Sequence, residues 1–223
     1  MAFTQRTIDF LSENRARNDK AWFEEHKPDY QKHVLEPMVA FVTRLTPALL
    51  SIDDALLCEP KSGKAISRIY RDTRFSHDKS LYRDVMWCGF MRNKKLYNGM
   101  PGFFFEVSPR GFRYGSGYYQ ASPQSMDSIR RLILDRNKHF VAALKAYETQ
   151  DRFQLEADSY KRRKYPDQPE NVQNWLDRKS ICFIHNSADF TLLFSEDLAD
   201  TVAEGFLALR PMHAFLIEAE SWK

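Results

Sequence analysis

Hydrophobic positions in the first quarter of the chain recur at the three- and four-residue spacing of an amphipathic helix. Thr4 is suited to cap a first helix, and Asn18 or Asp19 is suited to open a second one. Pro47 lies within a longer apolar face and predicts a kink or an end to that helix. This face follows the helical repeat at Met38, Phe41, Val42, Leu45 and Leu49. Residues 1–57 are therefore predicted to be helical.

The pattern changes after Pro60, where aromatic and β-branched residues become frequent and Gly, Pro and Asn separate the runs. Turn signals at Asn98-Gly99 and at residues 109–111 predict that successive strands pair as antiparallel hairpins. The region 61–120 is therefore predicted to form a sequential antiparallel meander. Its expected strands span residues 66–70, 85–91, 102–107 and 112–119.

Helical spacing returns in residues 122–178. Ser122 and Pro123 form a strong start signal, with the serine as the cap and the proline in the first turn. The apolar repeat that follows predicts one long helix, or two helices broken near Asn137, and Trp175 belongs to a further short helix.

The remaining region, residues 179–223, combines a predicted strand over residues 181–184 with a C-terminal helix. Ser195 is expected to cap that helix, and Pro211 is expected to end it before a terminal turn. Helices, a meander and further helices indicate a single α+β domain over the whole chain. We expect a central, mainly antiparallel sheet flanked by helices at both chain ends.

The net charge of the 223-residue chain is only +3, but its basic residues are concentrated in one region. Residues 61–95 contain ten Lys or Arg and three Asp, a local charge of +7 that leaves −4 for the rest of the chain. A local positive field attracts phosphate and carboxylate groups. We therefore expect an acidic partner to bind to this region.

The cysteines Cys58, Cys88 and Cys182 are scattered and lack the paired spacing of a disulfide framework or a zinc knuckle. The N-terminus shows no apolar signal-peptide core, and the longest apolar runs are far shorter than a membrane span. We expect a soluble cytoplasmic protein with no membrane association, no cofactor and no bound metal.

The most informative stretch is residues 68–84, which we call the arginine-rich segment. It contains too few apolar residues to be ordinary core. Guanidinium forks match phosphate and carboxylate groups bidentately, so several arginines beside an open loop are typical of an anion-binding site. The cations of the segment are Arg68, Arg71, Arg74, Lys79 and Arg83.

The same charges can instead hold the loop in shape. Asp72, Asp78 and Asp84 are close enough in sequence to pair with the neighbouring cations, and exposed charge runs are usually solvated. If residues 66–70 form a strand, alternation places its cations on opposite faces, so the following loop must supply the others. The sequence leaves the ion-pair network and the anion site open as alternatives.

For an anion site, we expect the arginines to supply the positive field and Asp72 to orient their guanidinium groups. Tyr82 and Lys179 are expected to add contacts to the ligand. The predicted ligand-binding residues are Arg68, Arg71, Asp72, Arg74, Lys79, Tyr82, Arg83 and Lys179.

The run from Arg68 to Arg83 resembles the signature of an uncharacterised bacterial and fungal family, domain of unknown function 2461. Leu81 stands where this family commonly has proline. The resemblance extends over nearly the whole chain and implies no established reaction, so it assigns no catalytic residue. The other segments that carry it are residues 10–30, 115–119 and 176–180.

Three functions are compatible with the sequence. We expect binding of a small anionic ligand that bears phosphate or carboxylate, in a cleft beside the sheet. A weaker alternative is a nucleic-acid-binding module that adds the basic residues 161–164 to the arginine-rich segment. A third is an enzyme acting on a phosphorylated metabolite, with a base drawn from Asp72, His77, Asp78 and Glu106. The sequence predicts neither a reaction nor an oligomeric state.

Overall fold

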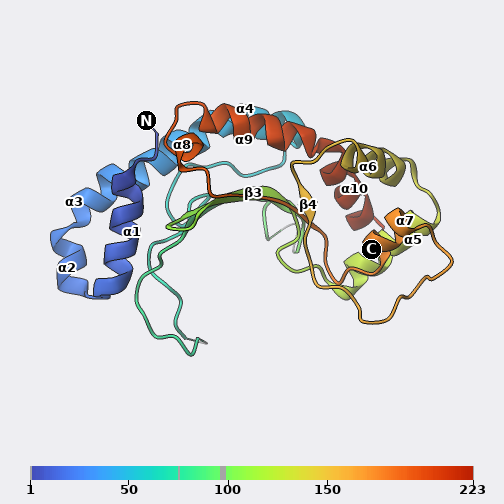
Figure 1. Ribbon diagram of the computed structural model, residues 1–223, viewed down its shortest axis with the longest axis horizontal. Helices are drawn as coiled ribbons and strands as arrows, with labels where there is room; N and C mark the ends of the chain where they lie inside the picture. The colour runs from blue at the N-terminus through green and yellow to red at the C-terminus, as the bar shows by residue number, and fades with distance from the viewer. Residues whose placement is uncertain (1, 75, 96–98, 223) are drawn as a thin grey trace.

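The computed structural model describes residues 2–74, 76–95 and 99–222. These residues form a central five-stranded antiparallel sheet in the order β1-β2-β3-β5-β4, with helices over one face and at both ends (Figure 1). The predicted α+β domain, with a central antiparallel sheet flanked by helices from both chain ends, is confirmed.

Polar residues begin the N-terminal helices, as the sequence predicts. Asp19 caps α2, because its carboxylate accepts a hydrogen bond from the Trp22 backbone N–H at 2.7 Å. Pro47 does not end α4, so the alternative of a helix end there is wrong. The helices of this region are α1 (Gln5–Arg17), α2 (Lys20–Glu25), α3 (Lys27–Tyr30), the π-helical η1 (Gln31–Leu35) and α4 (Glu36–Ile52).

The strands agree with most of the predicted meander. The first three pair in sequence, and Pro109 and Arg110 make the expected turn between the second and third. The turn signal at Asn98 lies outside the described residues. The strands are β1 (Met86–Phe90), β2 (Gly102–Ser108), β3 (Gly111–Gly117), β4 (Gln154–Leu155) and β5 (Cys182–Ser187).

The strand predicted for residues 66–70 is not formed. Within the described chain, Ile66 makes isolated bridges to Ser62 and to Cys88 of β1, but no continuous ladder follows from them. The hydroxyl oxygen of Ser67 accepts the hydrogen bond of the Trp87 backbone N–H at 3.0 Å. A continuing ladder would give that donor to a main-chain carbonyl instead. The segment therefore runs along the edge of β1 without becoming a strand.

The helices after the meander begin as predicted. Ser122 caps α5 by accepting a hydrogen bond from the Ser125 backbone N–H at 3.0 Å. Asn137 caps α6 by accepting one from the His139 backbone N–H at 2.8 Å, so this region contains two helices instead of one. The helices of the C-terminal half are α5 (Pro123–Leu134), α6 (Lys138–Glu148), α7 (Glu170–Leu176), α8 (Phe190–Leu193), α9 (Leu198–Ala208) and α10 (Arg210–Glu220).

Two predictions for the last fifty residues are wrong. Ser195 is not the cap of α9; its hydroxyl oxygen accepts a hydrogen bond from the Asp197 backbone N–H at 3.0 Å, and the helix begins at Leu198. Pro211 lies in the first turn of α10 instead of ending a helix before a terminal turn. A first-turn proline is tolerated because the N–H that it lacks has no intrahelical partner there.

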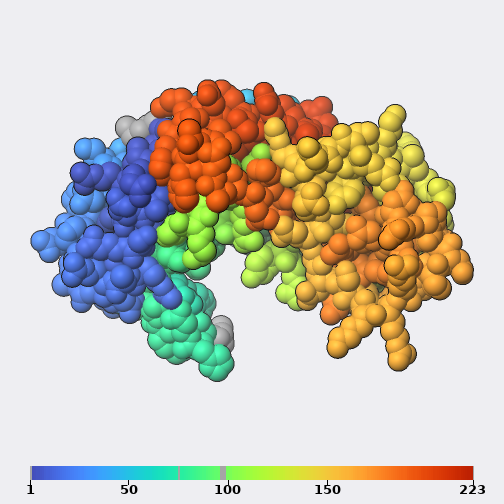
Figure 2. Space-filling model, in the orientation of Figure 1, coloured from blue at the N-terminus to red at the C-terminus, as the bar shows by residue number. Residues whose placement is uncertain are grey.

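The covered face of the sheet packs against α4, α9 and α10. The ring centroids of Phe105 in β2 and Phe41 in α4 lie 4.3 Å apart, and those of Phe103 and Phe206 of α9 lie 5.1 Å apart. Alternate residues of β2 therefore point to the other face, which is concave in the space-filling view (Figure 2). The hollow lies between the arginine-rich segment and the region 150–180.

Among the described residues, one helical stretch, residues 27–52, is long and apolar enough to cross a membrane by length and composition. Met38, Val42 and Leu45 of this stretch are fully buried in the hydrophobic core. A core helix of a soluble domain passes the same test of length and composition. The fold is accordingly that of a soluble globular domain.

β3 and β5 approach each other closely at glycine positions. A Cβ atom at Gly115 would lie 1.9 Å from the Phe183 carbonyl oxygen, and one at Gly117 would lie 2.4 Å from the Ile181 carbonyl oxygen. No side chain fits at such distances without a backbone shift. The glycines in the run Gly111–Gly117 therefore allow the sheet to continue from the meander into the C-terminal half.

A buried ion-pair network joins the end of α4 to the end of β1 and to α10. Asp53 accepts hydrogen bonds from Arg92 Nε at 2.9 Å and from Arg92 Nη2 at 3.1 Å. His213 Nε2 lies 3.0 Å from Asp53 Oδ2, and the side chains of Asp53 and His213 are only 4% and 2% exposed. Burial raises the pKa of Asp53, but the hydrogen bonds from His213 and Arg92 outweigh it and hold the pKa well below its usual range.

Replacing Asp53 by asparagine should destabilise the fold by about 3–5 kcal/mol, because Arg92 and His213 would lose a buried counter-charge. The measurement is the urea midpoint of unfolding at an unchanged slope. Asp54→Asn is the matched control, since Asp54 is the exposed neighbour and its loss should change stability by about 0.5 kcal/mol or less. Equal midpoints for the two variants would contradict a structural role for the network.

Gly115→Ala should destabilise the protein by about 1–3 kcal/mol or more, because the added methyl group collides with the Phe183 carbonyl. Gly89→Ala is the control on β1, where the nearest atom to an added Cβ is Met91 Cε at 3.9 Å. It should change stability by no more than about 1 kcal/mol. Thermal unfolding of both variants checks the comparison, and similar losses in the two would disprove the close approach.

Candidate functional site

The arginine-rich segment folds back on itself as a narrow loop. The Arg71 backbone N–H donates to the Leu81 carbonyl at 2.8 Å, and the Arg83 N–H donates to the Ile69 carbonyl at 3.0 Å. These bonds close the base of the loop, and residues 72–74 and 76–80 form the part of it that projects from the sheet (Figure 1).

Aromatic packing against the N-terminal helices anchors the base of this loop. Tyr82 is completely buried, with its ring centroid 4.9 Å from that of Phe23 in α2 and 5.1 Å from that of Tyr70. Its carbonyl oxygen accepts a hydrogen bond from Arg15 Nη1 of α1 at 3.0 Å. The first two helices therefore fix where the arginine-rich segment lies.

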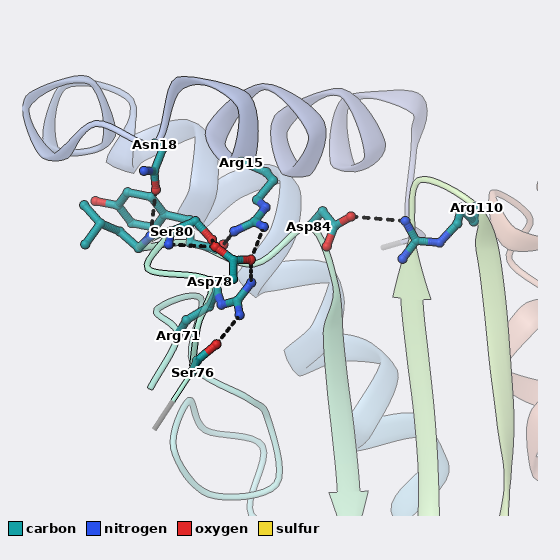
Figure 3. Close-up of polar contacts among 10 residues, drawn as sticks. Arg15, Asn18, Arg71, Ser76, Asp78, Ser80, Asp84 and Arg110 are labelled. Atoms are coloured by element: carbon teal, nitrogen blue, oxygen red, sulfur yellow. Dashed lines mark hydrogen bonds and ion pairs between the residues drawn. The ribbon is translucent and has the colours of Figure 1, made fainter. Parts of the chain in front are cut away.

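Asp78 organises the tip of the loop (Figure 3). Its carboxylate forms ion pairs with Arg71 and with Arg15, the latter at 2.6 Å. It also accepts hydrogen bonds from the Ser80 hydroxyl at 2.6 Å and from the Ser80 backbone N–H at 2.9 Å. The bonds from Ser80 and the contact with Arg15 hold the pKa of Asp78 well below its usual range.

Other charges of the loop are also paired. Asp72 accepts hydrogen bonds from Arg74 Nε at 2.9 Å and Nη2 at 2.7 Å, and these bonds lower the pKa of Asp72 to about 2. Lys79 Nζ donates to the Thr73 carbonyl at 2.9 Å. The structural alternative is thus partly confirmed: Arg71, Arg74 and Lys79 help to shape the loop.

Asp84 does not pair within the arginine-rich segment. It instead forms an ion pair at 3.2 Å with Arg110, in the turn between β2 and β3 (Figure 3). Because Arg110 is mostly exposed, this pair contributes little stability, and its effect is to tie the end of the segment to the neighbouring hairpin.

A groove of about 620 Å³ lies between the arginine-rich segment and the edge of β1. Among the described residues, Asp72 is the only carboxylate in its lining, and Tyr70 and Trp87 are its only aromatic residues. Such an excess of positive charge around a concave site favours an anionic occupant. The basic residues of the lining are Lys64, Arg68, Arg71, Arg74, Arg83 and Lys94.

Two guanidinium groups of the groove have no carboxylate partner among the described residues. Within the described chain, neither Arg68 nor Arg83 forms an ion pair, although Arg83 Nε donates to the Tyr70 carbonyl at 3.2 Å. Burial lowers the pKa of Arg83, the nearby charge of Arg71 lowers it further, and Asp72 raises it. An anion in the groove would supply the counter-charge that these groups lack.

The structure brings together five of the eight residues predicted to bind a ligand: Arg68, Arg71, Asp72, Arg74 and Arg83 all line the groove. Tyr82 lies in the core instead, and Lys79 turns to the loop backbone. Lys179 lies 5.8 Å from the ring centroid of Tyr160, in the region on the other side of the hollow.

Four charged or aromatic residues of the described lining were not among the predicted ligand-binding residues: Lys64, Tyr70, Trp87 and Lys94. Trp87 lies in the strand predicted for residues 85–91 but is not among the predicted ligand-binding residues. The signal that could have found it is alternation, because Met86 and Cys88 occupy the buried positions of β1 and leave Trp87 on the open face.

A Ser–His–Asp arrangement exists but is enclosed. Ser116 Oγ lies 3.5 Å from His213 Nδ1, and His213 Nε2 contacts Asp53. Ser116 and His213 are 0% and 2% exposed, so no substrate reaches the hydroxyl, and the contact is long for a nucleophile and its base. This set stabilises the fold.

Two other candidate acid–base residues either form an ion pair or lie outside the groove. Glu106 accepts hydrogen bonds from Arg113 Nε at 2.9 Å and Nη2 at 3.0 Å, which confirms an ion pair across β2 and β3. His77 is exposed on the loop tip and does not line the groove. Among the described residues, no group of three or more His, Cys, Asp or Glu is arranged to hold a metal ion.

Residues 6–215 match the model of a family described as conserved hypothetical protein (DUF2461). The chain belongs to this family. A search of the curated proteins found no match. The matched region contains the whole DUF2461-like arginine-rich segment and every residue of the groove lining.

Leu81 makes a contact that requires a backbone N–H at its position. Its backbone N–H donates to Asn18 Oδ1 at 2.6 Å, and proline has no such donor. Asn18 follows α1 with a positive φ of 50°. The loop is therefore tied to the end of α1 by a bond that depends on the backbone N–H of residue 81.

Asp78→Asn should loosen the loop tip, because Arg15 and Arg71 would lose their shared counter-charge. Trypsin should then cleave within residues 72–80 several-fold faster than in the wild type. The pKa of Asp78 is lowered, so its contribution is complete above about pH 4 and is lost only as the pH falls further. The ratio of the cleavage rates of variant and wild type should therefore be the same at pH 6 and pH 8.

Asp29→Asn, at an exposed position of α3, makes the same charge change outside the loop and is the control. Cleavage of Asp78→Asn at the rate of this control would show that the ion pairs do not hold the loop.

Proposed function

We propose that the groove binds a small ligand that bears a phosphate or carboxylate group. The observation that carries this proposal is the presence of Arg68 and Arg83, two guanidinium groups without carboxylate partners in the described chain, in the lining of one groove. Guanidinium groups bind both kinds of oxyanion through paired, charge-assisted hydrogen bonds.

The surrounding ion pairs support the proposal by keeping the groove in shape. Arg71 and Arg74 are positioned by Asp78 and Asp72, so their charges reach the groove without needing to reorganise when a ligand arrives. Preorganised charges of this kind lose less conformational entropy on binding than flexible side chains do. The ion pairs of the loop then hold the cations of the anion site in position.

Binding accounts for the groove better than acid–base catalysis does. Asp72 is the only carboxylate in the described lining, and Arg74 lowers its pKa to about 2, which makes it a weak base. No histidine or cysteine belongs to the described lining.

The three free cysteines elsewhere in the chain support a cytoplasmic location, where thiols stay reduced.

Arg68→Ala should weaken the binding of inorganic phosphate or citrate roughly tenfold to a hundredfold, the loss expected for charge-assisted hydrogen bonds. Isothermal titration of wild type and variant with each anion measures the change. Arg83→Lys, which keeps the charge but removes the fork, should weaken binding less than Arg68→Ala if charge dominates.

Arg131→Ala is the control, because Arg131 is an exposed residue of α5 outside the groove. It should leave anion binding unchanged, and the thermal midpoints of all free variants should agree. Equal affinities for Arg68→Ala and Arg131→Ala, or no binding to the wild type, would overturn the proposal.

A nucleic-acid-binding module is favoured by one further observation. Residues 161–164 are exposed, and Lys164 Nζ lies 4.0 Å from the ring centroid of Tyr160, in the region across the hollow from the groove. Two basic regions flanking a hollow suit an extended polyanion. Affinity for oligonucleotides that falls steeply with salt would favour this alternative over a small ligand.

A further inference from the structure

The groove is larger than a phosphate or carboxylate group requires. Its volume of about 620 Å³ lies within the range of roughly 300–1,000 Å³ that is typical of sites for whole small molecules. Cations occupy only part of the lining, and the floor is formed by the edge of β1. An anion held by Arg68 and Arg83 would therefore leave room for the rest of a larger molecule.

The two aromatic residues of the described lining show what kind of molecule fits. Tyr70 is 43% exposed, yet its ring is held by Phe23, at 5.5 Å between centroids, and by Tyr82, at 5.1 Å. A large aromatic ring that stays exposed on a rigid support provides a flat surface for stacking.

Trp87 supplies a second flat surface beside the cations. It lies half-buried on the open face of β1, and the Arg83 guanidinium carbon lies 4.5 Å from its ring centroid. Both side chains line the groove, so this cation–π pair contributes a planar surface and a positive charge at one place. Charge for an anion and flat surfaces for a planar ring thus occur side by side.

We propose that the groove binds a nucleoside phosphate, with its phosphate on Arg68 and Arg83 and its base against Tyr70 and the Arg83–Trp87 pair. This inference rests on the proposed anion site and specifies its ligand. A sugar phosphate would use the cations but not the stacking surfaces, because it carries no planar ring.

The experiment compares adenosine monophosphate, ribose 5-phosphate and inorganic phosphate by isothermal titration of the full chain. We expect adenosine monophosphate to bind roughly tenfold to a hundredfold more tightly than ribose 5-phosphate, the gain from stacking one base. Uridine monophosphate should show a smaller gain, because its base offers less surface for stacking.

Variants of the aromatic residues make the test specific. Tyr70→Leu should remove most of the preference for adenosine monophosphate, measured as the ratio of its affinity to that for ribose 5-phosphate. Tyr70→Phe keeps the ring and should keep the preference, which controls for misfolding of the leucine variant. Tyr160→Leu is the matched control, because Tyr160 is a 37% exposed tyrosine beside cations but outside the groove.

Each outcome decides between the hypotheses. Equal affinities for adenosine monophosphate and ribose 5-phosphate, both lost in Arg68→Ala, would overturn nucleoside recognition and leave the anion site intact. Absence of binding by all three compounds would overturn the anion site itself. A short single-stranded oligonucleotide that binds far more tightly than the mononucleotide, and loses affinity in Tyr160→Leu, would replace the proposal with nucleic-acid binding across the hollow.

Discussion

The pairing of β3 with β5 is the constraint on which the rest of the structure depends. β3 belongs to the meander near the middle of the chain, and β5 returns only after three intervening helices. The strands approach so closely that glycine is required where β3 meets the Phe183 and Ile181 carbonyl groups. One continuous sheet can therefore connect the two halves of the chain, and the hollow forms between their projecting parts (Figure 2).

The two faces of this sheet have different roles. The covered face holds the phenylalanine contacts to α4 and α9 and supplies the core, whereas the open face carries Trp87, Phe104 and Arg113. Trp87 lies half-buried on this open face and lines the groove together with Gly89, so β1 contributes to the groove as well as to the sheet. The sheet thus places an aromatic side chain next to the cations on one face, while its other face packs in the core.

The ion pairs and the anion groove are not competing descriptions of the arginine-rich segment. Asp78 and Asp72 neutralise some of its charge and define the loop, while Arg68 and Arg83 remain without carboxylate partners in the described chain. Exposed ion pairs contribute little to overall stability, so the more important effect of Asp78 is local order. A loop held in this way presents its remaining charges in a fixed arrangement, which is what recognition of a small anion needs.

The sequence by itself determined the fold class, the meander and most helix starts, because capping residues and the alternation of apolar positions act over a few neighbouring residues. It also located the arginine-rich segment, since five of the predicted residues line the groove. It could not show that Ser67 would interrupt the expected strand at residues 66–70, or that Tyr82 would be buried under α2. Those outcomes, the groove itself and the separation of Lys179 from it depend on contacts between residues far apart in the chain, which only the tertiary structure decides.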